Sequence, residues 1–262
     1  MEKVWERTKV LRDTCTQWCP GCMYGVAQRI VAEVIEEMGL QERAVLVVGV
    51  GCHTNAIVNF NIDVHSALHG RAPAVATGIK RMRPDLFTFT IQGDGDLCAI
   101  GIAEVIHAAM RGERFTTIFW NNAIYGQTGG QMAPTSLVGQ KTATSPLGRD
   151  VETKGEPLRV AEMISLIPGA AYVARTSLHE PAGIPKTKQA IRRAFEVQER
   201  GLGFSLVEVL TNCPSNWKLT PLESLRWMKE NMLPIYPLGE LKVPLLLPTG
   251  HRPESAPVRA GP

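Results

Sequence analysis

The sequence has no apolar run that approaches the ~20 residues needed to cross a bilayer, so we expect no membrane span. Its first residues, MEKVWERTKVLRD, are charged and lack the apolar centre of a signal peptide, which favours a cytoplasmic location. The formal net charge is only +3 and no run of basic residues occurs, so nothing indicates binding to nucleic acid. Hydrophobic residues make up 44% and charged residues 20%, which is typical of a soluble globular protein.

Apolar runs alternate with segments of helical character along most of the 262 residues. Apolar spacing and the placement of glycine and proline predict helices over 20–38, 69–82, 97–112, 158–166 and 185–201. Runs rich in apolar and β-branched residues predict strands over 44–51, 86–92, 115–120 and 204–210. This alternation predicts an α/β fold, built as a mostly parallel sheet with helices on both faces.

Two segments depart from the alternation. Between 121 and 157 no periodicity is clear, and a loop of that length in a compact domain is usually functional or disordered; its glycine- and amide-rich start favours function. Prolines accumulate from Leu233 onwards, as in a flexible tail or an arm that docks on another subunit. We therefore expect one main domain over 1–232 and a Pro-rich C-terminal arm or tail over 233–262.

Four short motifs follow directly after predicted strands: Gly51-Cys52, Gly93-Asp94, Asn121-Asn122 and Asn212-Cys213. In a parallel sheet all strands point the same way, so segments that follow the strands gather at the carboxyl edge. Open α/β sheets bind their ligands at this edge. Residues spread over most of the sequence are therefore predicted to form one site.

The QGDGD motif, 92–96, places a carboxylate between glycines that permit a sharp turn, just before a predicted helix whose N-terminus favours an anion. Magnesium prefers oxygen ligands at about 2.1 Å and commonly takes several of them from phosphates. The Asp94 carboxylate, the Asn122 amide and the backbone carbonyl of Ile124 would supply three such oxygens. GDG alone is equally compatible with a tight turn and a helix cap, but the NN pair and the TGGQ stretch beyond it favour a magnesium–diphosphate clamp.

Four of the six cysteines are candidate metal ligands, because reduced cysteines in the cytoplasm are more often ligands or core residues than disulfides. Cys19 and Cys22 have the C-x-x-C spacing of a metal half-site, and Cys52 and Cys213 follow predicted strands. Four soft thiolates suit zinc or an iron–sulfur cluster, and the spacing alone does not choose between them. The other two cysteines are expected just upstream of this cage and in an apolar helix: Cys15 and Cys98.

Taken together, WCPGC, HGRAPAVATG, GDGD and NNAIYGQTGGQ make the sequence similar to the β subunit of the 2-oxoacid:ferredoxin oxidoreductases, from about Trp18 to Leu238. The resemblance implies thiamine diphosphate bound through magnesium at Asp94, Asn122 and Ile124. It also implies a [4Fe–4S] cluster in the cysteine cage, since zinc has no redox chemistry. The thiamine-activating carboxylate would come from an α-type partner subunit, because no obvious candidate for it occurs in this chain.

The resemblance further implies which residues surround the cofactor. His69 and Arg71 are the candidate catalytic residues, and a structural ion pair is the alternative role for Arg71. His53 is a candidate for contact with the substrate or the cluster, and its alternative role is to support a neighbouring residue of the site. The complete set of candidate cofactor-binding residues is Gly51, His53, His69, Gly70, Gly93, Asp94, Gly95, Asp96, Asn122, Ile124, Tyr125 and Gly126.

The implied reaction is the coenzyme A-dependent oxidative decarboxylation of a 2-oxoacid, with electrons leaving through the cluster to ferredoxin. The implied assembly is a hetero-oligomer of anaerobic metabolism that includes γ and ferredoxin-like δ subunits. The stretch 72–113 is most similar to the branched-chain type, and the HTN that follows Gly51-Cys52 lacks the basic residue typical of 2-oxoglutarate enzymes, so 2-oxoisovalerate is the expected substrate. Activity on 2-oxoglutarate or pyruvate, and a zinc-stabilised non-catalytic interaction subunit, are the alternatives.

Overall fold

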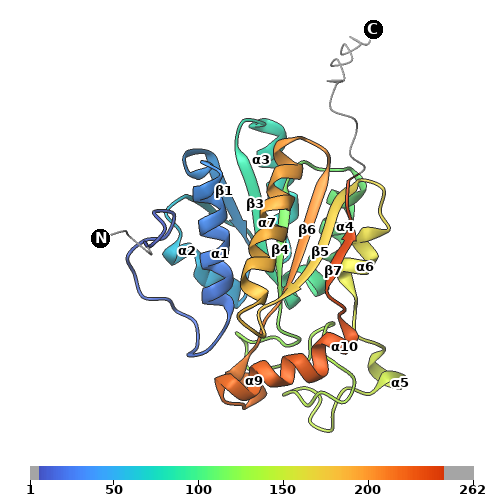
Figure 1. The fold of residues 1–262 in the computed structure, drawn as a ribbon. Coiled ribbons are helices and arrows are strands. Elements are labelled where there is room, and N and C mark those ends of the chain that lie inside the picture. Colours follow the sequence, from blue (N-terminus) through green and yellow to red (C-terminus); the bar gives the residue numbers. More distant parts are fainter. Residues whose placement is uncertain (1–5, 245–262) are drawn as a thin grey trace.

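The computed structural model describes residues 6–244, and this part of the chain forms a seven-stranded sheet (Figure 1). The strand order is β2-β1-β3-β4-β6-β5-β7, and neighbouring strands are parallel except for β7, which runs antiparallel to β5. The α/β class and the mostly parallel sheet are thus confirmed. The strands are β1 (Ala44–Val48), β2 (Asp63–Ser66), β3 (Phe87–Gly93), β4 (Thr116–Asn121), β5 (Ala170–Ser177), β6 (Phe204–Leu210) and β7 (Gly239–Lys242).

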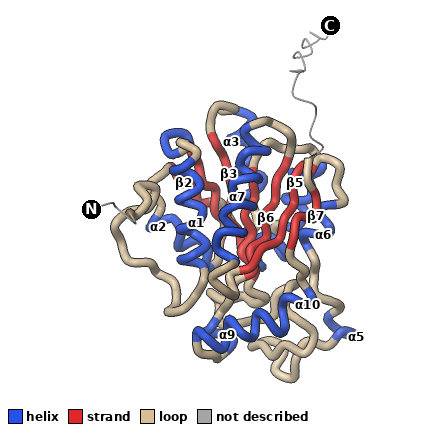
Figure 2. The backbone as a smooth tube through the Cα atoms, viewed as in Figure 1, coloured by secondary structure: helices blue, strands red, loops and turns tan. Residues whose placement is uncertain are grey.

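Helices cover both faces of the sheet, as Figures 1 and 2 show. Leu46 and Val48 of β1 belong to the core beneath α1 and α7, whereas Val47 between them belongs to the core beneath α3, α4 and α6. Successive side chains of a strand point to opposite faces, so a wholly apolar strand serves both cores. The helices are α1 (Tyr24–Glu37), α2 (Ala56–Asn59), α3 (Ala72–Met82), α4 (Ile102–Met110), α5 (Val151–Lys154), α6 (Val160–Ser165), α7 (Gly183–Glu199), α8 (Pro214–Trp217), α9 (Pro221–Trp227) and α10 (Leu233–Ile235).

Three strands were not predicted, and each lacks a strong apolar pattern. β2 is an exposed edge strand, β7 is short and polar, and β5 carries the buried cation of Arg175. Four predicted helices also begin later than expected, and the delay is greatest for α1 and α4. The residues before α1 form a tight turn in which Cys22 N donates to Cys19 O at 3.0 Å, and the residues before α4 form a π-helical turn over Asp94–Ile100.

The first part of the expected C-terminal arm packs on the main domain. Tyr236 is fully buried with Met228 and Met232, and β7 adds an edge strand to the sheet. The boundary expected after residue 232 therefore falls inside the packed domain. Residues 245–262 of the expected arm lie outside the described residues.

The carboxyl ends of the parallel strands meet at one edge of the sheet, and α9, α10 and the long segment between β4 and α5 lie beyond that edge (Figure 1). Adjacent strands carry the expected motifs to this edge, since Gly93 pairs in register with Trp120, next to Asn121. No helix within residues 6–244 is long and apolar enough to span a membrane.

Candidate functional site

A cavity of about 590 Å³ lies at the carboxyl edge of the sheet. It is lined by the ends of β1, β3 and β4 and by the segment that follows β4. All the candidate cofactor-binding residues line it except Gly70, whose N–H instead donates to Asp96. The sequence-based prediction missed five other lining residues: Tyr24, Val50, Ala99, Ile100 and Thr128.

Asp94 lies at the start of the π-helical turn and is only 3% exposed. Its Oδ1 accepts a hydrogen bond from Asn122 N at 3.2 Å, and its Oδ2 accepts one from the Thr135 hydroxyl. Burial raises the pKa of Asp94 to about 7, and these two hydrogen bonds oppose the rise only in part. A cation placed beside a carboxylate with this pKa would strongly stabilise its ionised form.

The turn after β4 is strained where it enters the cavity. Ala123 has a φ of +54°, in the left-handed region that residues other than glycine rarely adopt. Asn122 is 3% exposed, and its Oδ1 is buried without a hydrogen-bond partner among the described residues. A buried amide oxygen without a partner costs stability unless a ligand satisfies it. A hard cation beside Asn122 Oδ1 and Asp94 would do so, and the oxygen donors present therefore fit magnesium.

Part of the long segment between β4 and α5 supports this turn. The Ser136 hydroxyl and Gln140 Nε2 both donate to Ala123 O, at 2.6 and 3.0 Å. Arg149, which is 5% exposed, donates through Nη1 to the carbonyls of Pro134 and Ser136 at 2.9 and 2.7 Å. The segment expected to be functional is therefore an ordered support for the site.

Asp96 has a different environment from Asp94. Its Oδ1 lies 2.8 Å from His69 Nδ1 and accepts from Gly70 N at 2.7 Å, and its Oδ2 accepts from Gln92 Nε2 at 2.8 Å. Burial acts to raise the pKa of Asp96, but the nearby imidazole of His53 and the hydrogen bonds hold it well below the usual range. Asp96 thus acts as an acceptor that fixes the histidine walls of the cavity.

The two candidate catalytic residues take different positions. His69 lines the cavity, and its side chain is 37% exposed. Arg71 does not line the cavity and forms an ion pair with Glu104 of α4, which is the alternative role considered for it. His53 is 1% exposed and lines the cavity, and its Nε2 lies 3.6 Å from Asp96 Oδ2.

The candidate cage adjoins the cavity, and its Cys52 lines the cavity directly. An atom added at the Cβ position of Gly126 would lie 3.2 Å from Cys52 Sγ and 3.5 Å from Cys213 Sγ, so both sulfurs face the same wall. Burial, together with the nearness of the other cage thiols, raises the pKa of the Cys22 and Cys52 thiols to about 12. Such thiols are neutral alone and become thiolates when a metal centre binds.

The loops that carry these cysteines are tied to one another. Asn212 Oδ1 accepts from Met23 N at 2.9 Å, and Asn212 Nδ2 donates to Gly21 O at 3.0 Å. Trp18 Nε1 donates to Cys52 O at 2.9 Å. No three His, Cys, Asp or Glu side chains within residues 6–244 are grouped closely enough to hold a single metal ion. One zinc ion, with Zn–S bonds of about 2.3 Å, would need the sulfurs closer together.

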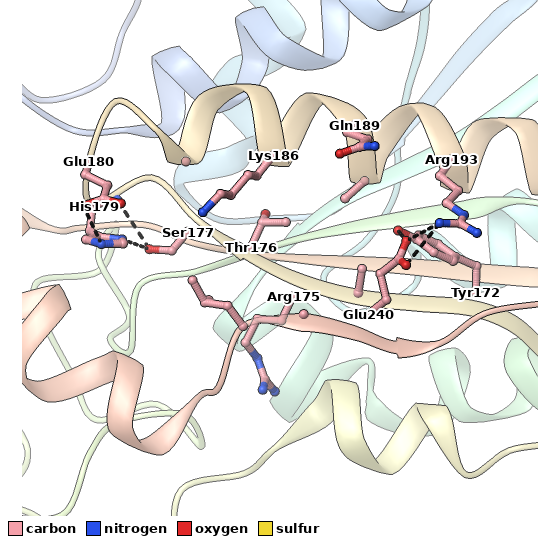
Figure 3. Close-up of a pocket in the computed structure, with 15 residues that line it drawn as sticks. Tyr172, Arg175, Thr176, Ser177, His179, Glu180, Lys186, Gln189, Arg193 and Glu240 are labelled. Atoms are coloured by element: carbon pink, nitrogen blue, oxygen red, sulfur yellow. Dashed lines mark hydrogen bonds and ion pairs between the residues drawn. The ribbon is translucent and has the colours of Figure 1, made fainter.

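A second hollow of about 380 Å³ lies between α7, strand β5 and the edge strand β7 (Figure 3). Lys186, Gln189 and Arg193 of α7 line one side, and Arg193 pairs with Glu240. Arg175 extends away from this helix, to the other side of its strand (Figure 3). No residue predicted for the site lines this hollow, so the cavity at the carboxyl edge is the candidate site.

Residues 49–209 match the thiamine pyrophosphate enzyme family, C-terminal TPP-binding domain, which agrees with the fold and the cavity. The chain is 42% identical over 92% of its length to ketoisovalerate oxidoreductase subunit VorA of Methanothermobacter thermautotrophicus, although it spans only 51% of that protein. It is 38% identical to 2-oxoglutarate synthase subunit KorB of Archaeoglobus fulgidus, with 82% of this chain and 76% of that one covered.

Among solved structures, the fold matches the 2-oxoglutarate:ferredoxin oxidoreductase from Magnetococcus marinus, solved with 2-oxoglutarate, coenzyme A and succinyl-CoA bound. The TM-score is 0.75 at 27% identity, over 87% of this chain and 74% of that one. The chain therefore belongs to the thiamine diphosphate-binding β-type subunits of the 2-oxoacid:ferredoxin oxidoreductases, as its motifs predict. These comparisons give no support to the zinc-stabilised, non-catalytic alternative.

Proposed function

We propose that this chain is the β-type subunit of a 2-oxoacid:ferredoxin oxidoreductase that converts a 2-oxoacid and coenzyme A to acyl-CoA and CO₂. Asp94, Asn122 and the Ile124 carbonyl would hold magnesium and, through it, thiamine diphosphate. Cys19, Cys22, Cys52 and Cys213 would hold a [4Fe–4S] cluster that passes electrons to ferredoxin. The observation that carries the proposal is the shared wall at Gly126, because Gly126 lines the cavity together with Cys52 and lies close to the sulfurs of Cys52 and Cys213.

When bound, thiamine diphosphate supplies the electron sink that lets a 2-oxoacid lose CO₂. The chain's own residues bind the cofactor and line the cavity in which the reaction takes place. Asp94 and Asn122 present oxygens at the end of the sheet, and the buried Asp96 orients His69 at the cavity wall. Asp94 and Asp96 are the carboxylates among the described lining residues, and both are already engaged. The carboxylate that activates the thiamine ring is therefore expected from an α-type partner.

The substrate proposed is 2-oxoisovalerate, a branched-chain 2-oxoacid. His53 follows Cys52 at the cavity, and the described lining residues include no lysine or arginine that could pair with a second carboxylate. The partner subunit shapes the rest of the pocket, and the alternatives are 2-oxoglutarate and pyruvate. The chain spans about half the length of the VorA relatives that it matches. We propose that γ and ferredoxin-like δ subunits and ferredoxin complete a cytoplasmic complex.

The proposal is tested by anaerobic turnover of the full chain purified with its partner subunits. With coenzyme A, thiamine diphosphate, magnesium and a viologen dye, 2-oxoisovalerate should be oxidised with a higher kcat/KM than 2-oxoglutarate or pyruvate. Preference for 2-oxoglutarate would correct the substrate alone. Absence of dye reduction with every 2-oxoacid, from a complex that holds iron and thiamine diphosphate, would contradict the proposed reaction.

A change at the shared wall should affect the cluster first. Gly126→Ala adds a methyl group 3.2 Å from Cys52 Sγ, and overpacking of this kind costs about 1–3 kcal/mol. We expect a lower iron content and an altered electron paramagnetic resonance spectrum. Gly78→Ala is the matched control, because nothing lies within 4 Å of its added Cβ. An unchanged iron content and spectrum in Gly126→Ala would show that the cluster does not lie beside Gly126.

A further inference from the structure

Arg175 is a fully buried cation that the proposed reaction does not use directly. It lies on β5 and is 1% exposed. Its Nε donates to Glu208 Oε2 at 2.8 Å, and its Nη1 donates to Glu162 Oε1 at 2.9 Å. Glu208 on the neighbouring strand β6 is also fully buried. A buried ion pair is often no more stabilising than an apolar pair of the same volume, so stability alone gives little reason for this one.

A first chain of hydrogen bonds leads from Arg175 to the strained turn. Asn121 Nδ2 donates to the second oxygen of Glu208, Oε1, at 2.7 Å. Asn121 Oδ1 in turn accepts from Ala123 N at 3.0 Å. The bonds cross three adjacent strands, β5, β6 and β4, and end at the residue with the positive φ. They fix the peptide that follows Asn122 and so set where its unpartnered Oδ1 lies.

A second chain leads from the same arginine to Asp94. The Arg175 guanidinium lies 5.2 Å from the centre of the Tyr236 ring. The Tyr236 hydroxyl donates to Thr135 O at 2.7 Å, and the Thr135 hydroxyl donates to Asp94 Oδ2. Tyr236 belongs to the segment that the sequence predicts to be an arm. Asn122 and Asp94, the two side chains of the clamp, are thus both connected to the buried Arg175.

We infer that Arg175 and Glu208 are positioning residues for the cation clamp, acting on Asn122 through Asn121 and on Asp94 through Tyr236 and Thr135. The inference rests on the proposed magnesium–thiamine diphosphate site and adds the residues that hold its ligands in place. Replacing residues that orient metal ligands lowers metal affinity by about 10–100-fold, even though they do not touch the metal.

Glu208→Gln tests the first chain. The amide can accept from only one of its two donors, Arg175 Nε or Asn121 Nδ2, so one of the two bonds must break. With the full chain in its complex, we expect the magnesium concentration for half-maximal thiamine diphosphate binding to rise about tenfold, while saturating magnesium restores binding and the iron content stays unchanged. Glu113→Gln is the control, because Glu113 is a 7% exposed carboxylate that accepts from Arg81 and Arg111 far from the clamp.

Tyr236→Phe tests the second chain, since it removes the hydroxyl and keeps the ring beside Arg175. We expect about a fivefold rise in the same magnesium midpoint, the effect of one neutral hydrogen bond. Tyr172→Phe is its control, because this buried hydroxyl donates to Glu240. Calorimetric magnesium titrations decide the outcome. Unchanged midpoints in Glu208→Gln and Tyr236→Phe, or equal shifts in the controls, would overturn the inference alone. Failure of the wild-type complex to bind thiamine diphosphate with magnesium would overturn both the inference and the proposed clamp.

Discussion

Replacing Asp94 with alanine should abolish the magnesium-dependent binding of thiamine diphosphate and leave the iron content of the protein unchanged. Asp94 is the buried carboxylate of the clamp, and the neighbouring Asn122 Oδ1 has no other partner among the described residues. Removing the charge leaves one amide oxygen and one carbonyl, which bind a hard cation poorly. Isothermal titration of the anaerobic complex with thiamine diphosphate, with and without magnesium, measures the effect.

The pKa of Asp94 predicts in addition how magnesium binding depends on pH. In the metal-free chain the pKa is raised from 3.8 to about 7, so the folded state holds a proton that the unfolded state releases between these values. The stability contributed by this proton is present below pH 3.8 and is lost as the pH rises through about 7. Magnesium must displace the same proton, so the apparent magnesium affinity should fall as the pH drops below about 7.

An isosteric substitution at Asp94 tests whether its carboxylate causes this pH dependence. Asp94→Asn should bind magnesium weakly at every pH, with no midpoint near 7, whereas Asp85→Asn, at an exposed carboxylate beside Arg83, should behave as wild type. Wild-type affinity for magnesium and thiamine diphosphate in Asp94→Ala or Asp94→Asn would remove Asp94 from the clamp.

The parts of the fold that the sequence predicts are those whose local pattern agrees with their environment. Strands buried on both faces are mainly apolar runs: Ala44–Val48 is wholly apolar, and Phe204–Leu210 is interrupted by Ser205 and Glu208 alone. β5 could not be recognised in the same way, because the burial of Arg175 depends on Glu208 and Glu162, which are distant in sequence. The short strand β7 is specified by its pairing with β5 and not by its own residues.

In the candidate site, too, the residues that a local sequence pattern marks are the ones that can be predicted. Asp94 and Asn122 are predictable because a ligand residue at the end of a strand carries a local motif and because topology brings strand ends together. Thr135, Gln140 and Tyr236 have no motif, since each acts through one hydrogen bond that only the folded chain creates. Arg71 was expected to act at the cofactor, but its side chain turns towards Glu104 on the next helix and forms an ion pair with it. The sequence around Arg71 does not show this direction.

Replacing Cys213 with serine should remove most of the iron and the brown colour of the anaerobically purified protein. Cys213 is 8% exposed, and its sulfur lies near Gly126 and accepts a hydrogen bond from Asn216 Nδ2 at 3.4 Å. A serine hydroxyl is a harder and less readily ionised ligand than a thiol, so it binds iron of a sulfide cluster poorly. The wild-type protein should hold about four irons per chain, as a [4Fe–4S] cluster requires.

Two other cysteines provide matched controls for this change. Cys98 is 4% exposed and packs in the apolar core beneath α4, and Cys15 is exposed upstream of the cage. Cys98→Ser should cost stability because it buries a hydroxyl, yet retain full iron, and Cys15→Ser should change neither. Iron analysis and electron paramagnetic resonance of the reduced proteins compare the three variants. Full iron and an unaltered signal in Cys213→Ser would exclude Cys213 as a ligand, whereas iron loss in Cys15→Ser would place Cys15 in the cage. Magnesium-dependent thiamine diphosphate binding should survive in Cys213→Ser, because the clamp draws its oxygens from the ends of β3 and β4 and Cys213 does not line the cavity.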